Sequence, residues 1–370
     1  MNAPILGIDG SLGYPAYSGS VSNPMLASAL ITVRESSLAG NATHGLYRSD
    51  YTPVRPPFLQ ENDVDWRPRT KVQGLQANVR AALIEMELLR NIQFVESEAS
   101  AGVALVDGGP TIATLGRLTE CVFQRQLQLV ASFAALRAER SLEILTQVVP
   151  QSAHWSSIAG LSPERHRYTW ELIGIGLRFA MMVTMQLKYA LNVARPWALS
   201  AVVQPMLLTP GYTAYPSGHA TEAHFVAELI PLLVGDPTHP HSESEHADRK
   251  DGIAAQLNRL AFRIAENRVV AGLHYPVDSI AGQVLGVMLA RYLVWLTGDP
   301  LPRFKKKTLD VGAIAFPQPG AIDGDTERPA FDCFVDQQEH VEEPSSTLPS
   351  KVPPAPVLRD LWALARREWA

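Results

Sequence analysis

Three short stretches of the chain define both its chemistry and its fold: KYALNVARP at 188–196, AYPSGHAT at 214–221 and RVVAGLHYPVD at 268–278. In the first, Lys188 and Arg195 are seven residues apart, almost two turns of an α-helix, which predicts that both cations project from one helix face. Pro196 cannot continue the helix comfortably, so we expect Arg195 at or near its C-terminal end. Two positive charges aimed the same way suit an anion.

The second stretch has the character of a helix start. Pro216 and Ser217 stand ahead of a largely apolar run over 220–234, a pattern typical of a helix N-terminus. Such an end offers free backbone N–H groups and the positive end of the helix dipole to an oxyanion. Gly218 would let an oxygen come close to the backbone.

The third stretch adds a forked donor and a second histidine. Arg268 fits the oxygens of a tetrahedral or trigonal oxyanion, and His274 can attack, ligate or shuttle protons. Gly272 and Pro276 predict that the helix carrying Arg268 stops before His274. Asp278 lies one turn beyond His274, close enough to orient the imidazole if a new helix begins there.

In this order, the three stretches resemble the superfamily that joins type 2 phosphatidic acid phosphatases, bacterial class A acid phosphatases and vanadium-dependent haloperoxidases. The resemblance covers roughly residues 165–297, and it implies an all-α fold in which four-helix bundles surround one oxyanion site. One departure is Asn267, where the family commonly has serine. Asparagine keeps a donor and an acceptor, so we expect the site to tolerate the change.

The resemblance also implies a role for each residue. The residues that would hold the oxyanion are Lys188, Arg195, Ser217, Gly218, His219, Arg268 and His274. In a phosphatase, His274 would attack phosphorus, Asp278 would hold its tautomer and His219 would protonate the leaving oxygen. In a haloperoxidase the same residues would hold vanadate, with His274 as the ligand of vanadium and His219 assisting the deprotonation of hydrogen peroxide.

Composition bears on the choice between these branches. A mean hydropathy of -0.01 is typical of a soluble globular protein, and charged residues interrupt the apolar runs at 172–191 and 277–296, so we expect buried bundle helices and no membrane insertion. A net charge of -5 argues against a general nucleic-acid binder. No export signal is visible at the N-terminus, so we expect a cytoplasmic protein, whereas class A acid phosphatases are periplasmic.

These features favour a vanadate-dependent haloperoxidase that uses hydrogen peroxide to oxidise bromide or iodide rather than chloride. The alternative is a soluble acid phosphatase that hydrolyses phosphomonoesters through a phosphohistidine, with phosphate as substrate or product and no cofactor. Tyr212 stands where bromide-using relatives often have histidine and chloride-using relatives an aromatic residue. It is either a substrate-side residue or a loop tyrosine packed beneath the second stretch.

We expect four segments along the chain: a loop-rich N-terminal wrap over 1–70, a helical layer over 71–160, the catalytic bundle over 161–298 and an extended tail over 299–370. Apolar residues spaced three and four apart predict amphipathic helices. In chain order, these helices are predicted over 73–94, 111–149 (with a break near Arg140), 163–194, 253–270 and 277–296.

Three further features carry weaker signals. The tail ends in an apolar stripe that predicts a helix docked on its own bundle or on a second subunit, hence a homo-oligomer: Leu358, Leu361, Trp362, Ala365 and Trp369. The loop 237–248 holds three histidines, but its prolines and acids favour a solvated loop over a metal site. Cys121 and Cys333 lack any metal or redox spacing, so we expect two reduced thiols.

Overall fold

The computed structural model describes residues 71–148, 151–236, 252–299, 307–309 and 352–369. Our predictions for 1–70, for the histidine-rich loop and for Cys333 lie outside these residues. The chain separates into two compact units, residues 1–82 and 83–370. The described part of the first unit is a turn over 71–75 that leads into helix α2 (Ala77–Leu89), where Nη1 of Arg80 donates to the carbonyl oxygen of Val72 at 3.1 Å.

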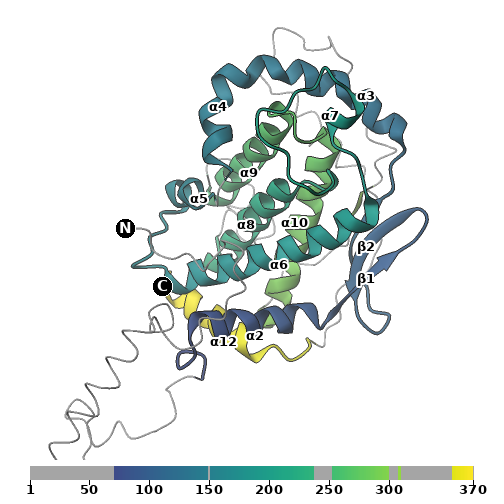
Figure 1. The fold of residues 1–370 in the computed structure, drawn as a ribbon. Coiled ribbons are helices and arrows are strands. Elements are labelled where there is room, and N and C mark those ends of the chain that lie inside the picture. Colours follow the sequence, from purple (N-terminus) through teal and green to yellow (C-terminus); the bar gives the residue numbers. More distant parts are fainter. Residues whose placement is uncertain (1–70, 149–150, 237–251, 300–306, 310–351, 370) are drawn as a thin grey trace, which may run out of the picture. The chain divides into compact units, whose positions relative to one another are not determined.

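The described chain is mostly helical, as the sequence predicted. The second unit, from Leu83 onward, contains the helices that build the bundle (Figure 1). After α2 they are α3 (Glu120–Ser132), the short 3-10 helix η2 (Phe133–Leu136), α4 (Arg137–Thr146), α5 (Ser152–Ala159), α6 (Arg167–Leu191), α7 (Pro196–Leu199), α8 (Gly218–Val234), α9 (Ile253–Val270), α10 (Pro276–Thr297) and α12 (Pro356–Arg367).

Helix α10 forms the centre of the bundle, and nearly all of its side chains are buried. Helix α8 lies along α10, and α6 and α9 pack against α8 (Figure 1). The α8–α10 contact is close because it is made at glycines. A Cβ at Gly282 would lie 2.7 Å from the carbonyl oxygen of Ser217, and one at Gly286 would lie 2.3 Å from that of Thr221. This contact fixes the second stretch against the third.

Among the described residues, α10 is also long and apolar enough to span a membrane by length and composition. Most of it, 89% of the apolar window, is buried inside the protein, and a core helix meets the same criteria. The prediction of a buried bundle helix over 277–296 is confirmed.

A small sheet was not predicted. Its strands run in the order β1 (Ile92–Glu96), β2 (Ser100–Leu105), β3 (Thr111–Gly116) and β4 (Lys307–Leu309). The first two pairings are antiparallel, and β3 pairs with β4 in parallel. The helix predicted over 73–94 therefore ends at Leu89, and the one predicted from Thr111 begins only at Glu120. Strand β2 is buried along almost its whole length, so its sequence shows no alternation to distinguish a strand from a helix.

Two predicted helix boundaries also need correction. The break expected near Arg140 lies earlier, at the 3-10 turn Phe133–Leu136, and α4 runs unbroken through Arg140. The helix predicted over 163–194 ends at Leu191 because Asn192 adopts a left-handed conformation, with φ 48°. Lys188 and Arg195 therefore do not share a helix face, since Arg195 is the residue that caps the start of α7.

The tail helix docks on its own bundle, against α6, α8 and α10. Four residues of its predicted stripe are buried there: Leu358, Leu361, Trp362 and Ala365. The fifth, Trp369, stacks on His166 with the ring centroids 4.4 Å apart. The apolar surface on which we based the expectation of a homo-oligomer is thus covered by the chain itself.

Candidate functional site

The first stretch contributes a buried lysine from the last turn of α6. Lys188 is 1% exposed, and its Nζ donates to the carbonyl oxygens of Thr213 at 2.8 Å and Ala214 at 2.6 Å. An ammonium group has three donors, so one N–H is left beyond these two bonds for a ligand. Burial and the neighbouring Arg195 lower the pKa of Lys188 to about 7. A negative charge beside this lysine would raise its pKa again, so the site favours an anion.

Arg195 reaches the same region from the loop that follows α6. Its Nε and Nη2 both donate to the carbonyl oxygen of Tyr212 at 3.2 Å, and Nη1 donates to that of Leu273 at 3.0 Å. The same Nη1 lies 3.1 Å from Nε2 of His274. Because a guanidinium group only donates, Nε2 of His274 must carry the lone pair.

The other nitrogen of His274 faces a carboxylate. Its Nδ1 lies 2.8 Å from Oδ2 of Asp278, which also accepts the backbone N–H of Tyr275 at 3.0 Å. As the spacing predicted, a new helix begins at Pro276 and brings Asp278 to the ring. Burial and then Arg195 lower the pKa of His274 well below its ordinary value, so the ring is neutral with its proton on Nδ1. Burial raises the pKa of Asp278.

The second stretch forms the predicted N-terminus of α8, with Ser217 as its cap. The backbone N–H of Ser217 donates to the carbonyl oxygen of Asp278 at 2.9 Å, which ties the second stretch to the third. Ser217 is fully buried, and its Oγ accepts from the N–H of Ala220 at 3.4 Å. A Cβ at Gly218 would have no described atom within 4 Å beyond its own chain neighbours, so space is open beside this helix end.

His219, one residue further along α8, is also held in a single tautomer. Its Nε2 lies 3.0 Å from the main-chain carbonyl oxygen of Gln147. A carbonyl oxygen only accepts, so Nε2 carries the proton and Nδ1 the lone pair. Burial and then Arg268 lower the pKa of His219 to about 4, which leaves the ring neutral at neutral pH.

Arg268, from the last turn of α9, is 1% exposed and faces the C-terminal end of α4. Its Nη2 donates to the carbonyl oxygen of Ile144 at 3.1 Å and to Oε1 of Gln147 at 3.0 Å. Its Nε is buried without a hydrogen-bond partner among the described residues. Burial lowers the pKa of Arg268 to about 10, so the group stays charged at neutral pH.

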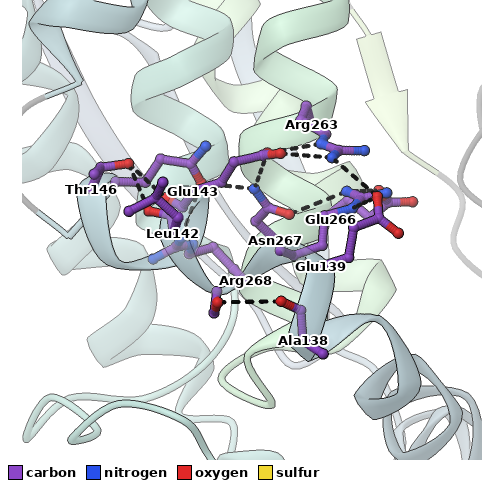
Figure 2. Close-up of polar contacts among 12 residues, drawn as sticks. Ala138, Glu139, Leu142, Glu143, Thr146, Arg263, Glu266, Asn267 and Arg268 are labelled. Atoms are coloured by element: carbon purple, nitrogen blue, oxygen red, sulfur yellow. Dashed lines mark hydrogen bonds and ion pairs between the residues drawn. The ribbon is translucent and has the colours of Figure 1, made fainter.

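Asn267 takes part in a polar cluster beside Arg268 (Figure 2). Its Nδ2 donates to Oε2 of Glu143 at 3.0 Å and to Oε1 of Gln147 at 3.1 Å, and its Oδ1 accepts from Arg140 at 3.2 Å. Glu143 is held by Arg263 at 2.7 Å, and the hydrogen bond from Arg263 lowers its pKa to about 2. Asparagine uses both ends of its amide here, which a shorter serine side chain could not do.

The contribution of α4 was missed at the sequence level. Its inward polar residues recur every three or four positions, namely Arg137, Arg140, Glu143 and Gln147. This spacing is a signal for one polar helix face. Such a face usually points to solvent, so the spacing did not by itself indicate a buried contact. The helix was predicted from its apolar residues alone.

Tyr212 lies at the exposed edge of the site and not beneath the second stretch. Its side chain is 45% exposed, and its ring centroid is 5.4 Å from Nζ of Lys188 and 5.5 Å from Cζ of Arg195. Burial raises the pKa of the phenol. The ring therefore lies close to two of the three cations.

The assembled site fits an oxyanion. Lys188, Arg195 and Arg268 each lower the pKa of both His219 and His274, so the three cations act on a common space. The Nε of Arg268, which has no partner among the described residues, is a free donor for an oxygen of vanadate or phosphate. The open space beside Gly218 leaves room for such an oxygen. No cluster of three or more His, Cys, Asp or Glu in the described ranges could hold a bare metal ion.

Comparison with known proteins supports the predicted resemblance. Residues 170–300 match the model of the PAP2 superfamily. The vanadium-dependent bromoperoxidase of Ascophyllum nodosum is 31% identical over 91 residues, which cover 21% of this chain and 16% of that protein. The crystal structure described as the first bacterial vanadium-dependent iodoperoxidase matches with a TM-score of 0.36 and 19% identity, over 46% of this chain and 48% of that one. The chain therefore spans less than half the length of either relative.

Proposed function

We propose that this protein is a vanadate-dependent haloperoxidase that oxidises bromide or iodide with hydrogen peroxide. The observation that carries the proposal is the state of His274, a neutral ring that presents the lone pair of Nε2 beside Arg195. Such a nitrogen can ligate vanadium, and the three buried cations can neutralise the oxygens around it. The match to the PAP2 superfamily over 170–300 and the local similarity to a bromoperoxidase support the same reading.

Each residue has a task in binding the group. Lys188, Arg195 and Arg268 would donate hydrogen bonds to the oxygens, and Nε2 of His274 would hold the vanadium. Asp278 keeps the proton of His274 on Nδ1, so that Nε2 carries the lone pair. Vanadium would take the place that Nη1 of Arg195 holds on this lone pair. When bound, vanadate supplies a Lewis-acidic centre that activates hydrogen peroxide.

His219 would act as the base in this reaction. Its Nδ1 carries a lone pair, and a pKa of about 4 keeps that lone pair free at neutral pH. It can therefore accept a proton from incoming hydrogen peroxide. In the overall reaction, hydrogen peroxide, halide and one proton give hypohalous acid and water, so the halide is oxidised by two electrons and one peroxide oxygen leaves as water.

The second candidate function is hydrolysis of phosphomonoesters, which the PAP2 match favours equally. His274 would then attack phosphorus through Nε2, and His219 would have to deliver a proton to the leaving oxygen. An anionic substrate would offset the cations that lower the pKa of His219, so a protonated His219 is compatible with this reaction. We place the peroxidase first because of the local similarity to a bromoperoxidase.

The deciding experiment uses the purified protein freed of bound anions. We expect orthovanadate to create bromide-dependent and peroxide-dependent bromination of a phenolic dye, with inorganic phosphate as a competitor. His274→Ala is the control and should show no vanadate-dependent turnover. Efficient hydrolysis of p-nitrophenyl phosphate without any halide-dependent turnover would establish the phosphatase instead.

A further inference from the structure

Gln147 occupies an unusual position in the site. It is the residue that ends α4, it is 1% exposed, and it lies outside the region 170–300 that matches the PAP2 superfamily. From this position it contacts both the second and the third stretch. Its main-chain carbonyl oxygen and its side-chain Oε1 accept hydrogen bonds from different residues.

The main chain of Gln147 fixes His219. The last carbonyl groups of a helix have no partner within the helix, so they are free to accept a hydrogen bond from elsewhere. The carbonyl oxygen of Gln147 accepts from Nε2 of His219 at 3.0 Å. This bond leaves the lone pair on Nδ1, which is the atom that the proposed reaction needs.

The side chain of Gln147 holds Arg268. Its Oε1 accepts from Nη2 of Arg268 at 3.0 Å and from Nδ2 of Asn267 at 3.1 Å. With Nη2 also bound to the carbonyl oxygen of Ile144, the outer end of the guanidinium group faces α4. The remaining donors of Arg268, the orphaned Nε among them, are then left for a ligand.

Polar contacts with α9 hold helix α4 in place, and so fix the position of Gln147. At its N-terminal end, Nε of Arg137 donates to the carbonyl oxygen of Val270 at 2.9 Å. In its middle, Arg140 forms an ion pair with Glu266 at 2.8 Å, and both groups are buried. One helix turn before Gln147, Glu143 binds Arg263 (Figure 2). The partner in each of these contacts is on α9, so α4 is held along the helix that carries Arg268.

We propose that Gln147 is a positioning residue whose side chain sets the orientation of Arg268, and that α4 is therefore part of the catalytic site. The proposal rests on the proposed function, because it assigns Arg268 to oxyanion binding. The side chain of Gln147 is not proposed to touch substrate, because it acts through Arg268.

The test compares oxyanion binding by isothermal titration calorimetry, with orthovanadate and inorganic phosphate as probes. Gln147→Met keeps the length of the side chain but removes the acceptor, and we expect it to weaken both probes about tenfold. Thr146→Ala is the matched control, because Thr146 is exposed at the adjacent position and bonds to carbonyl oxygens of its own helix. It should bind both probes within about twofold of the wild type.

A double-mutant cycle separates positioning from a general loss of structure. If Gln147 acts through Arg268, Gln147→Met should change affinity less than about twofold in an Arg268→Met background. Equal losses in both backgrounds would overturn the proposal, as would wild-type affinity in folded Gln147→Met. Gln147→Asn serves if the methionine variant does not fold, because it keeps an amide but is one methylene shorter and brings its oxygen less close to Arg268. It should weaken both probes, and unchanged binding would again refute the role.

The two failures are distinguishable. Wild-type protein that binds neither orthovanadate nor phosphate would refute the proposed function. Wild-type protein that binds either probe, with the Gln147 variants binding equally well, would refute only the positioning role.

Discussion

Nδ1 of His274 lies 2.8 Å from Oδ2 of Asp278, and the same oxygen accepts the backbone N–H of Tyr275 at 3.0 Å. One carboxylate oxygen thus orients the ring and begins α10. Both partners are almost completely buried, at 5% and 0% exposure. The contact makes two properties of Asp278 separable by mutation: its geometry as an acceptor and its negative charge.

The first prediction separates them. Asp278→Asn can place its amide oxygen where Oδ2 stands, so it keeps the ring orientation and loses the charge. Asp278→Ala loses both. We expect turnover to fall about 10–100-fold in the asparagine variant, the usual effect of changing the partner of a ligating histidine, and further in the alanine variant. Steady-state rates at saturating orthovanadate measure this, and equal rates in Asp278→Asn and the wild type would refute a role for the charge.

The second prediction compares the loss of a cation, Lys188, with the loss of His274, the residue proposed to ligate vanadium. Lys188→Met removes one of three buried positive charges, and a charge-assisted hydrogen bond contributes about 1.5–3 kcal/mol. We expect orthovanadate to bind roughly 10–100-fold more weakly, with turnover largely restored at saturation. His274→Ala should give no turnover at any vanadate concentration. Titrations of activity against orthovanadate distinguish the two, and complete, equal loss of anion binding in both variants would contradict these assignments.

Much of the site could be predicted from sequence because its three stretches are local. The start of α8 at Ser217, the end of α9 after Arg268 and the restart at Pro276 depend on proline, glycine and capping residues within a few positions. The contact of Asp278 with His274 follows from the four-residue spacing once α10 begins there. Local rules were sufficient for these features.

The rest depends on long-range contacts that no local pattern contains. Gln147 meets Arg268 across 121 positions of sequence, and Arg140 meets Glu266 across 126. The early stop of α6 was missed because Asn192 takes a left-handed conformation that its sequence permits but does not require. Strand β2 was missed because a short, mostly apolar and buried run fits a helix equally well.

The third prediction concerns Glu222, one turn into α8. Burial raises its pKa to about 7 in the folded protein, against 4.5 for the ordinary side chain. The unfolded chain therefore ionises first as pH rises, so the stability that this group contributes is fully present below pH 4.5 and is lost as pH rises through about 7. Glu222→Gln avoids this cost. It should raise the unfolding midpoint at pH 8 by about 2–4 °C and have little effect below pH 4.5.

Thermal unfolding at several pH values measures the difference between Glu222→Gln and the wild type. Glu164→Gln, the same substitution at an exposed position, provides the control. A difference that is the same at acidic and alkaline pH would contradict the assignment.

The fourth prediction concerns the halide. The ring of Tyr212 lies over Lys188 and Arg195, and its phenol cannot shuttle protons at neutral pH because burial raises its pKa further. Tyr212→His places a titratable ring there. We expect the ratio of bromide to iodide rates or the pH optimum to change, with vanadate affinity nearly unaffected. Tyr212→Phe is the control for ring packing, and rate ratios and a pH profile unchanged in the histidine variant would make Tyr212 a structural residue.

The last prediction concerns the tail helix, which completes α6 from 200 residues away. The side chain of Glu368 accepts the backbone N–H groups of Tyr168 at 2.7 Å and Thr169 at 2.8 Å. These are orphan donors in the first turn of α6, where His166 occupies the cap position without a side-chain cap bond. A carboxylate there also complements the positive end of the helix dipole.

Glu368→Ala should therefore destabilise the protein by about 1–2 kcal/mol, the usual cost of losing an N-terminal cap. Urea unfolding measures the change, with Arg367→Ala as the control because Arg367 is the exposed neighbour. Lys188 lies at the opposite end of α6, roughly 30 Å away for a helix of this length, so orthovanadate affinity of the folded variant should stay within about twofold of the wild type. Stability unchanged from the wild type would show that α6 does not depend on the tail. A loss of affinity with unchanged stability would show instead that the tail acts on the site itself.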